Sequence, residues 1–403
     1  MDLNLPDPLR RIFFFGLFIL VAVLIIGTYF LGSLLISKNK SIQGMLHLQP
    51  VVHKSSEVFG FAPFWLLDKL DNVDWNTLTT FAYFSLPVNS DGSIDKTSFE
   101  WETFNGPRLA SLFKNANDHK VRKVVTLTQM NSADIETFLG DESAWSRLAD
   151  DSVDVLKSRN LDGVNIDFEY IPSDDSLKSQ FSKFMAFYSG ELHKRLNNPY
   201  VTVSVLASSV RFDKIYDISS LSKSTDGIFM MAYDYYTPDS KSIGPSAPLY
   251  GYNDGHGPFW YDVSTAVDDF IKVADPRKII LGVPYYGWNY YAYNPSPRSD
   301  SVSWTEATPT TADKADSEKL LATTPVGGWD NTAKVSWRGY WDNEGWHVVY
   351  MEDKNSLGLK YDFAKEKNLA GVGIWALGYD SGDNNLWALL KEKFAPSELA
   401  YKL

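Results

Sequence analysis

The sequence predicts an α/β fold: a (β/α)8 TIM barrel with a small α+β insertion between strands 7 and 8, preceded by one N-terminal transmembrane helix. Three observations support this prediction. Eight short apolar runs alternate with longer segments of helical periodicity, an uncharged apolar stretch of 25 residues lies near the N-terminus, and the gap between the last two runs is too long for one helix. The 403 residues also exceed the roughly 250 residues that such a barrel needs.

The N-terminal apolar stretch covers residues 12–36 and carries no charge. About 20 apolar residues span the hydrocarbon core of a bilayer, so this stretch is long enough to cross it with some tilt. A cleaved signal peptide, which is the alternative, has a shorter apolar run and a small-residue cleavage site. We therefore expect residues 1–37 to form a cytoplasmic stub with a transmembrane anchor, followed by a linker at 38–57. Because a short N-terminus precedes a large domain, we expect a single-pass membrane protein with its catalytic domain on the extracytoplasmic side, although the flanking positive charges nearly cancel.

The domain predicted for residues 58–397 contains the eight apolar runs. Continuous apolar strands that alternate with helices indicate a parallel sheet covered on both faces, and eight such units fit a closed barrel. Segments such as 176–196 and 263–274 have the helical periodicity expected between the strands. A doubly wound open sheet is the alternative, but it usually has a Gly-rich phosphate loop after its first strand, and none is present. The eight runs are residues 58–65, 78–86, 121–128, 163–170, 200–207, 227–235, 278–287 and 371–377.

The segment between the seventh and eighth runs, about residues 289–350, is rich in Pro, Gly and Trp. It contains strand-like pieces at 334–337 and 346–351. We interpret it as a small insertion that packs beside the mouth of the barrel and forms one wall of a cleft.

Composition excludes several classes of function. A net charge of −12 argues against nucleic-acid partners, because a phosphate-binding surface needs clustered Lys and Arg. The chain has no Cys, which excludes disulfides, thiolate metal sites and cysteine nucleophiles, and its six His are scattered without a metal-binding spacing. We therefore expect neither a metal nor a cofactor. Aromatic residues make up 15% of the chain, which suits either a well-packed core or a cleft where rings stack on sugars.

The fourth run carries a row of polar residues on one face. Side chains alternate along a strand, so Asn165, Asp167 and Glu169 share a face that we expect to point into the barrel. The opposite face, toward the helices, carries Val164, Ile166 and Phe168. Polar groups inside a barrel cost roughly 1–3 kcal/mol each unless they find partners, so the row is either a self-satisfied buried network or a functional site. The place of Glu169 at the carboxyl end of the strand, where barrels carry out their chemistry, favours a site.

The same run resembles the Asp-Gly-x-Asp-x-Asp-x-Glu motif of glycoside hydrolase family 18, the chitinases and their relatives. Three later segments at matching barrel positions are similar to elements of that family's sixth, seventh and eighth strands, and the resemblance extends over about residues 58–395. The three segments are 231–234 (Met-Ala-Tyr-Asp), 282–287 (Gly-Val-Pro-Tyr-Tyr-Gly) and 371–376 (Gly-Val-Gly-Ile-Trp-Ala).

One position departs from the usual family pattern, which has Asp where this chain has Asn165. Together with Phe168, this Asn makes the run similar to the spore-cortex and peptidoglycan-directed branch of the family and to its chitinase-domain relatives. That branch includes active hydrolases, so Asn165 is compatible with activity.

The residues themselves leave two mechanisms open. Glu169 is placed to protonate a leaving group, and Asp167 lies about 6.5 Å away along the strand. Two carboxylates on one face repel each other, which favours a protonated Glu169. Asp167 could then serve as the nucleophile of a conventional retaining enzyme. The family resemblance implies instead that the 2-acetamido oxygen of the substrate attacks the anomeric carbon and forms an oxazolinium ion.

The resemblance also implies roles for the remaining residues. Asp167 would accept the acetamido N–H, Tyr233 would donate to the acetamido oxygen, and Asn165 would hydrogen-bond Asp167. We expect Asp162, at the start of the strand and on the other face, to be structural. Substrate-binding candidates are Trp375 as the stacking floor, Met231 and Asp234 beside Tyr233, and Tyr286 and Trp288 as weaker candidates for cleft walls.

We therefore expect a retaining glycosidase that cleaves β-linked N-acetylglucosamine-containing glycans, namely peptidoglycan, chitin or chitooligosaccharide. The alternative is a non-catalytic sugar-binding protein on the same barrel. Loss of the terminal Glu marks such lectins, and Glu169 is present, which favours the enzyme. Transglycosylation, in which a sugar replaces water at the oxazolinium, also remains open.

Overall fold

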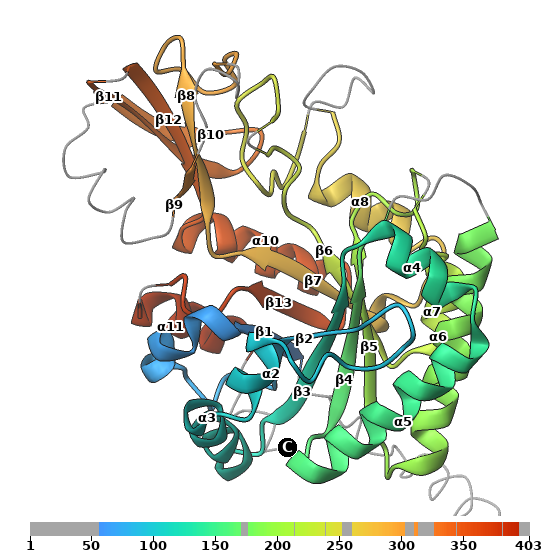
Figure 1. The fold of residues 1–403 in the computed structure, drawn as a ribbon. Coiled ribbons are helices and arrows are strands. Elements are labelled where there is room, and N and C mark those ends of the chain that lie inside the picture. The colour runs from blue at the N-terminus through green and yellow to red at the C-terminus, as the bar shows by residue number, and fades with distance from the viewer. Residues whose placement is uncertain are drawn as a thin grey trace, which may run out of the picture. The chain divides into compact units, whose positions relative to one another are not determined.

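The predicted barrel is present in the computed structural model (Figure 1). Eight parallel strands close in the order β1-β13-β7-β6-β5-β4-β3-β2, and each predicted run supplies one strand. The strands are β1 (Glu57–Pro63), β2 (Thr80–Pro87), β3 (Arg122–Gln129), β4 (Gly163–Phe168), β5 (Tyr200–Leu206), β6 (Gly227–Met231), β7 (Ile279–Pro284) and β13 (Gly371–Trp375). The structure describes residues 56–170, 176–212, 214–237, 239–251, 260–302, 310–312, 326–343, 345–380 and 382–394.

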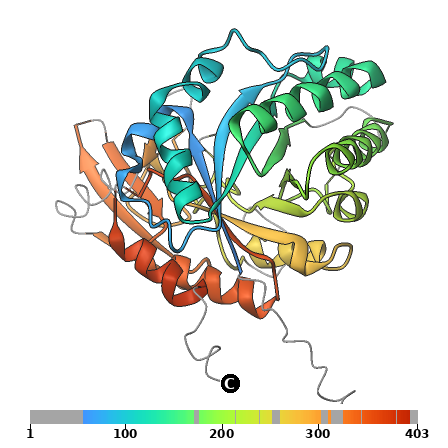
Figure 2. The same ribbon diagram turned by 90° about the horizontal axis from the view of Figure 1, so that it is seen from below.

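Helices surround the barrel, as the end-on view in Figure 2 shows. They cover the strands because the outward side chains are apolar: Val164 and Ile166 of β4 share one buried cluster with Phe184 of the helix that follows. Several helices begin with a side-chain cap, as where Asp217 and Asp262 accept the backbone N–H groups of the first turn. The helices are η1 (Phe64–Asn72), α2 (Phe99–Phe104), α3 (Pro107–Asp118), α4 (Ser132–Leu139), α5 (Glu142–Arg159), α6 (Ser176–Arg195), α7 (Ile218–Ser224), α8 (Val263–Phe270), η2 (Pro276–Lys278), α10 (Lys354–Glu366) and α11 (Asn384–Phe394).

The interior of the barrel is filled by large side chains. Phe59, Phe61 and Phe229 pack together, with ring centroids 4.7 to 5.5 Å apart. Gly373 on β13 makes room for this packing, because a Cβ atom there would lie 2.1 Å from the ring of Phe229. The barrel is therefore a packed core, and only its carboxyl end is available for a site.

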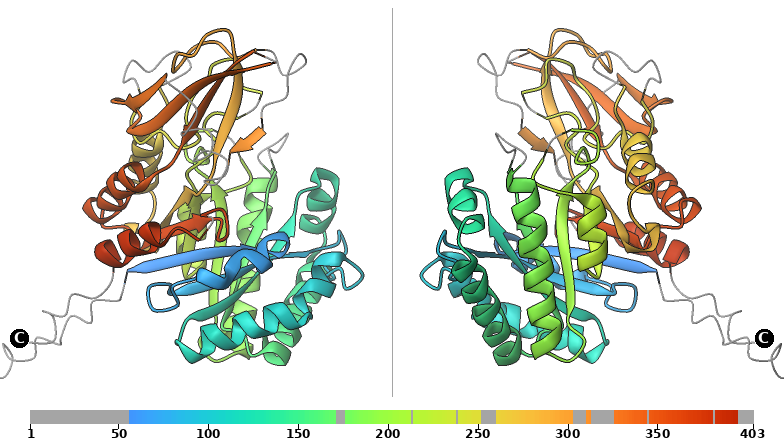
Figure 3. Two further views of the ribbon diagram at one scale, coloured as in Figure 1. Left: turned by 90° about the vertical axis from the view of Figure 1, so that its left-hand side faces the viewer. Right: turned by 90° about the vertical axis from the view of Figure 1, so that its right-hand side faces the viewer.

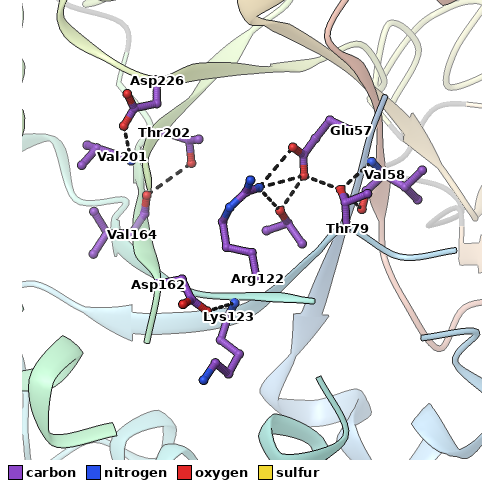
Figure 4. A network of polar contacts seen from close by, with 11 residues as sticks. Glu57, Val58, Thr79, Arg122, Lys123, Asp162, Val164, Val201, Thr202 and Asp226 are labelled. Carbon is purple, nitrogen blue, oxygen red and sulfur yellow. Dashed lines mark hydrogen bonds and ion pairs between the residues drawn. The ribbon is translucent and has the colours of Figure 1, made fainter. Parts of the chain in front are cut away.

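The opposite end, where the strands begin, is closed by a charged cluster (Figure 4). The buried carboxylate of Glu57 accepts hydrogen bonds from the hydroxyls of Thr79 and Thr80 and from Arg122 Nη1, at 3.1 Å from Oε2. The guanidinium of Arg122 also lies over the ring of Tyr200, 3.9 Å from its centroid. This cluster links the starts of β1, β2, β3 and β5.

Two further carboxylates join neighbouring strands at this end (Figure 4). Asp162 Oδ2 accepts the backbone N–H of Lys123 at 2.8 Å, and Asp226 Oδ2 accepts that of Val201 at 2.8 Å. Each acid precedes its own strand and satisfies a donor that the adjacent strand leaves open. The structural role predicted for Asp162 is therefore confirmed.

The predicted insertion is a separate antiparallel sheet at one end of the barrel (Figures 1 and 3). Its strand order is β10-β11-β12-β8-β9, and β8 follows directly on the seventh barrel strand. Tyr290, Val348 and Tyr350 on its apolar face pack against Ile243 of the loop after β6. The described residues of this insertion contain no helix, so the helical part of the predicted α+β unit is not seen there. The strands are β8 (Gly287–Ala292), β9 (Thr310–Ala312), β10 (Val326–Asp330), β11 (Val335–Asp342) and β12 (Gly345–Met351).

The predicted single-pass membrane location is corrected by the structure. A spanning helix needs about 20 predominantly apolar residues, and within the described ranges no helix is both long and apolar enough. Helix α6 has 20 residues but carries Lys178, Lys183 and Lys194 among others. The predicted segment, residues 12–36, lies outside the described residues. We therefore no longer assign the chain to a membrane.

Candidate functional site

Strand β4 presents its polar and apolar residues on opposite faces, as predicted. Asn165 is fully buried and Asp167 is 3% exposed, while Phe168 packs outward in the cluster that includes Phe138 and Phe184. The strand ends at Phe168, so Glu169 is the first residue beyond it. Its backbone N–H donates to the carbonyl oxygen of Gln129 at 3.1 Å, which fastens this residue to the end of β3.

Asn165 is held by β5 and not by its own strand. Its Nδ2 donates to Ser204 Oγ at 2.9 Å, and its Oδ1 accepts from Thr202 Oγ1 at 2.9 Å. The predicted hydrogen bond from Asn165 to Asp167 is therefore wrong. Same-face residues of one strand are about 6.5 Å apart, whereas neighbouring strands lie only about 4.8 Å away, so the cross-strand partners are nearer.

The carboxyl group of Asp167 is buried and incompletely bonded. Its Oδ1 atom has no hydrogen-bond partner. Burial, followed by the charge of Glu169, raises the pKa of Asp167 well above its ordinary value. Burial and the charge of Asp234 also raise the pKa of Glu169. Because the two carboxyls disfavour double ionisation, they hold one proton between them over a wider pH range than isolated acids would.

Tyr233 follows the end of β6 and faces the same carboxyls. Burial raises its pKa well above the ordinary value, and the charges of Asp167, Glu169 and Asp234 add to the effect. Its hydroxyl therefore remains protonated and can donate a hydrogen bond. Met231, which ends β6, is 8% exposed. It belongs to the aromatic cluster inside the barrel, and Tyr233 packs against this cluster.

Asp234 connects the barrel mouth to the insertion. Its Oδ1 accepts from Tyr286 Oη at 2.6 Å, from Trp288 Nε1 at 3.1 Å and from Ser246 Oγ at 3.1 Å. Its φ of 57° is in the left-handed region, which Asp tolerates better than most residues and which turns the chain directly after Tyr233. Tyr286 and Trp288 are thus joined to the site through Asp234.

An aromatic surface adjoins the carboxyls. Trp375 ends β13, and its ring lies 4.6 Å from that of Phe84 and 5.5 Å from that of Phe61. Beyond Phe84 the series continues to Trp65, whose ring is 6.1 Å away and which is 48% exposed. Phe84 and Trp65 were not predicted from the sequence. Trp65 follows the end of β1, and Phe84 of β2 pairs with Pro63, the last residue of β1.

A third residue not predicted from the sequence is Tyr216, in the loop after β5. It is 1% exposed, and its hydroxyl donates to the carbonyl oxygen of Phe168 at 2.7 Å. The peptide group between Phe168 and Glu169 is therefore held on both sides, by Tyr216 at its carbonyl and by Gln129 at its N–H. The nearby charges of Glu169 and Asp167 contribute, after burial, to a raised pKa of Tyr216.

Taken together, the site contains a partly exposed acid that can hold a proton, a buried acid with an open acceptor atom, a phenol donor and an aromatic surface. Within the described ranges, no group of His, Asp or Glu side chains could hold a metal ion. This set suits proton transfer to a leaving group and stabilisation of positive charge next to Asp167.

Comparisons with known proteins agree with this geometry. A family model described as glycosyl hydrolases family 18 matches residues 57–380. A Bacillus subtilis protein named as a sporulation-specific glycosylase, YdhD, is 25% identical over 296 residues, which cover 70% of this chain and 63% of that protein. Di-N-acetylchitobiase of Homo sapiens is 25% identical over 270 residues, which cover 60% of this chain and 66% of that protein. The chain thus spans slightly less than two thirds of the length of each relative.

A solved structure shares the fold. The Group IV chitinase of Ostrinia furnacalis, crystallised with allosamidin, aligns with a TM-score of 0.72 at 22% identity. The alignment covers 84% of this chain and 99% of that chain.

We predict that Asp167→Asn raises the free energy of unfolding at neutral pH by about 1–3 kcal/mol, because the amide cannot ionise and so avoids the cost of a buried negative charge. A carboxyl whose folded pKa is raised contributes its full stability below its unfolded pKa of about 4, and that stability falls as the pH rises through the folded pKa. The difference in the free energy of unfolding between the variant and the wild type should therefore be small near pH 4 and grow toward pH 8. Urea unfolding across this range measures it.

The matched control is Asp68→Asn, because the side chain of Asp68 is 99% exposed and its variant should show no such trend. An equal difference between Asp167→Asn and wild type at every pH would contradict the raised pKa.

Proposed function

The chain belongs to family 18 of the glycosyl hydrolases, and we propose that it is a retaining glycosidase that cleaves β-linked N-acetylglucosamine-containing glycans by substrate-assisted catalysis. The observation that carries the proposal is the arrangement at the end of β4. There, a buried carboxyl with an unpaired oxygen, Asp167, lies beside a second carboxyl of raised pKa, Glu169, which follows the end of the strand.

In the first step Glu169 gives its proton to the glycosidic oxygen. Its raised pKa keeps it protonated at a pH where an ordinary Glu would be ionised, as a general acid requires. The bond from the anomeric carbon to that oxygen breaks, and the 2-acetamido oxygen of the same sugar bonds to the anomeric carbon.

Asp167 and Tyr233 act on the acetamido group in this scheme. The open Oδ1 of Asp167 accepts the acetamido N–H, and the negative charge of its carboxylate stabilises the oxazolinium ion. Tyr233, whose hydroxyl stays protonated, donates to the acetamido oxygen. Water then attacks the anomeric carbon and returns a proton to Glu169, which restores the acetamido group and retains the anomeric configuration.

The remaining residues bind the glycan. Trp375, with Phe84 and Trp65 beside it, offers rings on which sugars stack. In this proposal, the other wall of the glycan-binding site, facing the rings of Trp375, Phe84 and Trp65, is formed by Asp234, Tyr286 and Trp288. The substrate class rests on the relatives, of which one is named as a sporulation-specific glycosylase and another as a di-N-acetylchitobiase.

Glu169→Gln should abolish turnover of chitotetraose and of purified peptidoglycan while leaving binding of chitotetraose within about threefold of wild type, because the amide keeps the shape but carries no acidic proton. Product analysis by mass spectrometry and titration calorimetry measure the two quantities. Glu142→Gln, the same change at an exposed residue of α5, serves as the control. Activity of the Glu169 variant within tenfold of wild type would reject Glu169 as the acid, and a wild type that binds but never cleaves would identify a sugar-binding protein.

The substrate-assisted route predicts that a β-1,4-linked glucose oligomer, which lacks the 2-acetamido group, is not hydrolysed under conditions where chitotetraose is. If Asp167 were the nucleophile, a 2-deoxy-2-fluoro glycoside would instead trap a covalent adduct on it. Intact-protein mass spectrometry after incubation distinguishes the two routes.

Tyr216 is predicted to be a positioning residue for Glu169. Tyr216→Phe removes the hydrogen bond to the Phe168 carbonyl, worth about 1 kcal/mol, and should lower kcat about tenfold with little change in KM. The acidic limb of the pH profile should also shift.

The control for this prediction is Tyr188→Phe. Tyr188 is fully buried too, but its hydroxyl donates to Ser152 Oγ in the helical layer. This variant should lose comparable stability and keep its kcat and pH profile. Equal kcat values for the two variants would show that Tyr216 has only a structural role.

A further inference from the structure

A pocket lies on the insertion sheet, away from the carboxyls of β4. It has a volume of about 430 Å³ and is lined by Gly328 and Trp329 of β10, Ser336 and Arg338 of β11, and Asn355 of α10. In the described part of the sheet, β10 is an edge strand separated from β8 by two strands. At about 4.8 Å per strand, the two strands that line the pocket, β11 and β10, are about 10 and 14 Å from β8, the strand that contacts Asp234.

Arg338 is held in this pocket by the backbone around it. It pairs directly across the sheet from Gly327, and a Cβ atom at that glycine would lie 2.4 Å from Arg338 Cδ. Only glycine therefore leaves room for the side chain to lie across β10. Its Nη1 donates to the carbonyl oxygen of Trp337 at 2.8 Å, which orients the guanidinium.

The charge of Arg338 is not paired with a carboxylate among the described residues, which sets it apart from most arginines of this acidic protein. Seven others form ion pairs or bidentate contacts: Arg108, Arg122, Arg147, Arg195, Arg211, Arg277 and Arg298. Asp330, which directly follows Trp329, pairs with Arg298 at 2.5 Å. The other acid close in sequence to the pocket, Asp353, also has its partners. Its Oδ1 caps α10 and its Oδ2 accepts from Ser336 Oγ at 2.6 Å.

The pocket thus combines an oriented guanidinium, a tryptophan ring and the amide of Asn355. A planar guanidinium recognises a carboxylate through two parallel N–H donors, and the ring and amide suit the apolar and peptide groups attached to it. A chitin chain is neutral and offers no such group. Peptidoglycan carries carboxylates on its stem peptides, and on the lactyl groups of those muramic-acid units that bear no peptide.

We propose that this pocket is an accessory site that binds a carboxylate of the peptide-bearing muramic-acid units of peptidoglycan, and so holds the enzyme on that polymer outside the catalytic cleft. The substrate side of this inference rests on the proposed function, which it narrows from three glycans to the anionic one. Binding at the pocket requires no cleavage, so the accessory-site proposal and the proposed glycosidase function can be contradicted independently.

The test uses muramyl dipeptide and N,N′-diacetylchitobiose as soluble probes and purified peptidoglycan sacculi as the polymer. Arg338→Gln should weaken muramyl dipeptide binding by about tenfold or more, because it removes a charge-assisted contact, and should leave chitobiose binding unchanged. Co-sedimentation with sacculi should fall in parallel, and for the wild type it should decrease as salt rises from about 0.05 to 0.3 M. Arg338→Lys should bind muramyl dipeptide with intermediate affinity, because lysine keeps the positive charge but loses the two parallel N–H donors of the guanidinium.

Arg277→Gln is the matched control, because Arg277 is exposed, pairs with Asp275 and lies where β7 begins, at the other end of the barrel. Muramyl dipeptide binding that is equal in wild type and Arg338→Gln, or that is no tighter than chitobiose binding and unaffected by salt, would overturn the accessory site. Failure of the wild type to cleave any glycan while the binding contrast persists would overturn the proposed function and leave the pocket assignment standing.

Discussion

The buried carboxyl of Asp167 is the constraint on which the rest of the site depends. An acid inside a packed barrel, with one oxygen unpaired, is unfavourable for folding, and it persists only because the surrounding structure is rigid enough to hold it. The interior of the same barrel is filled by the packed rings of Phe59, Phe61 and Phe229. The neighbouring Asn165 forms its side-chain hydrogen bonds with β5 and donates none to Asp167. This oxygen therefore lacks a hydrogen-bond donor, the part that the proposed mechanism gives to the acetamido N–H.

Asp234 gives the insertion a direct part in the same site. The carboxylate belongs to the loop after β6, but one of its three donors is the indole of Trp288 on β8. Substitutions in the insertion sheet can therefore alter the orientation of Asp234, and through its charge the acidity of Glu169, without touching the barrel strands. The insertion sheet and the pKa of Glu169 are therefore linked through the side chain of Asp234.

Most of the barrel could be predicted from the sequence, because its strands are uninterrupted apolar runs and its faces follow simple alternation, as in β4. The shared face of Asn165, Asp167 and Glu169 follows from that alternation, whereas the role of Tyr233 came from the resemblance to the family's sixth strand. The partners of Asn165 could not be predicted, since they depend on the register between β4 and β5. Tyr216 was missed for a similar reason: its hydroxyl meets the Phe168 carbonyl only after the loop beyond β5 folds back. The pocket around Arg338 likewise depends on a cross-strand pairing with Gly327 that periodicity does not reveal.

The charged cluster at the start of the strands has a consequence for how such an enzyme can diversify. The carboxylates of Glu57, Asp162 and Asp226 join the first residues of neighbouring strands. The groups that donate hydrogen bonds to them lie at the same end of the barrel. The acids at the carboxyl end contribute nothing comparable to closing the barrel. Mutational drift can therefore retune the working pH or the preferred glycan at one end of the molecule, while purifying selection for a foldable chain acts mainly on the other.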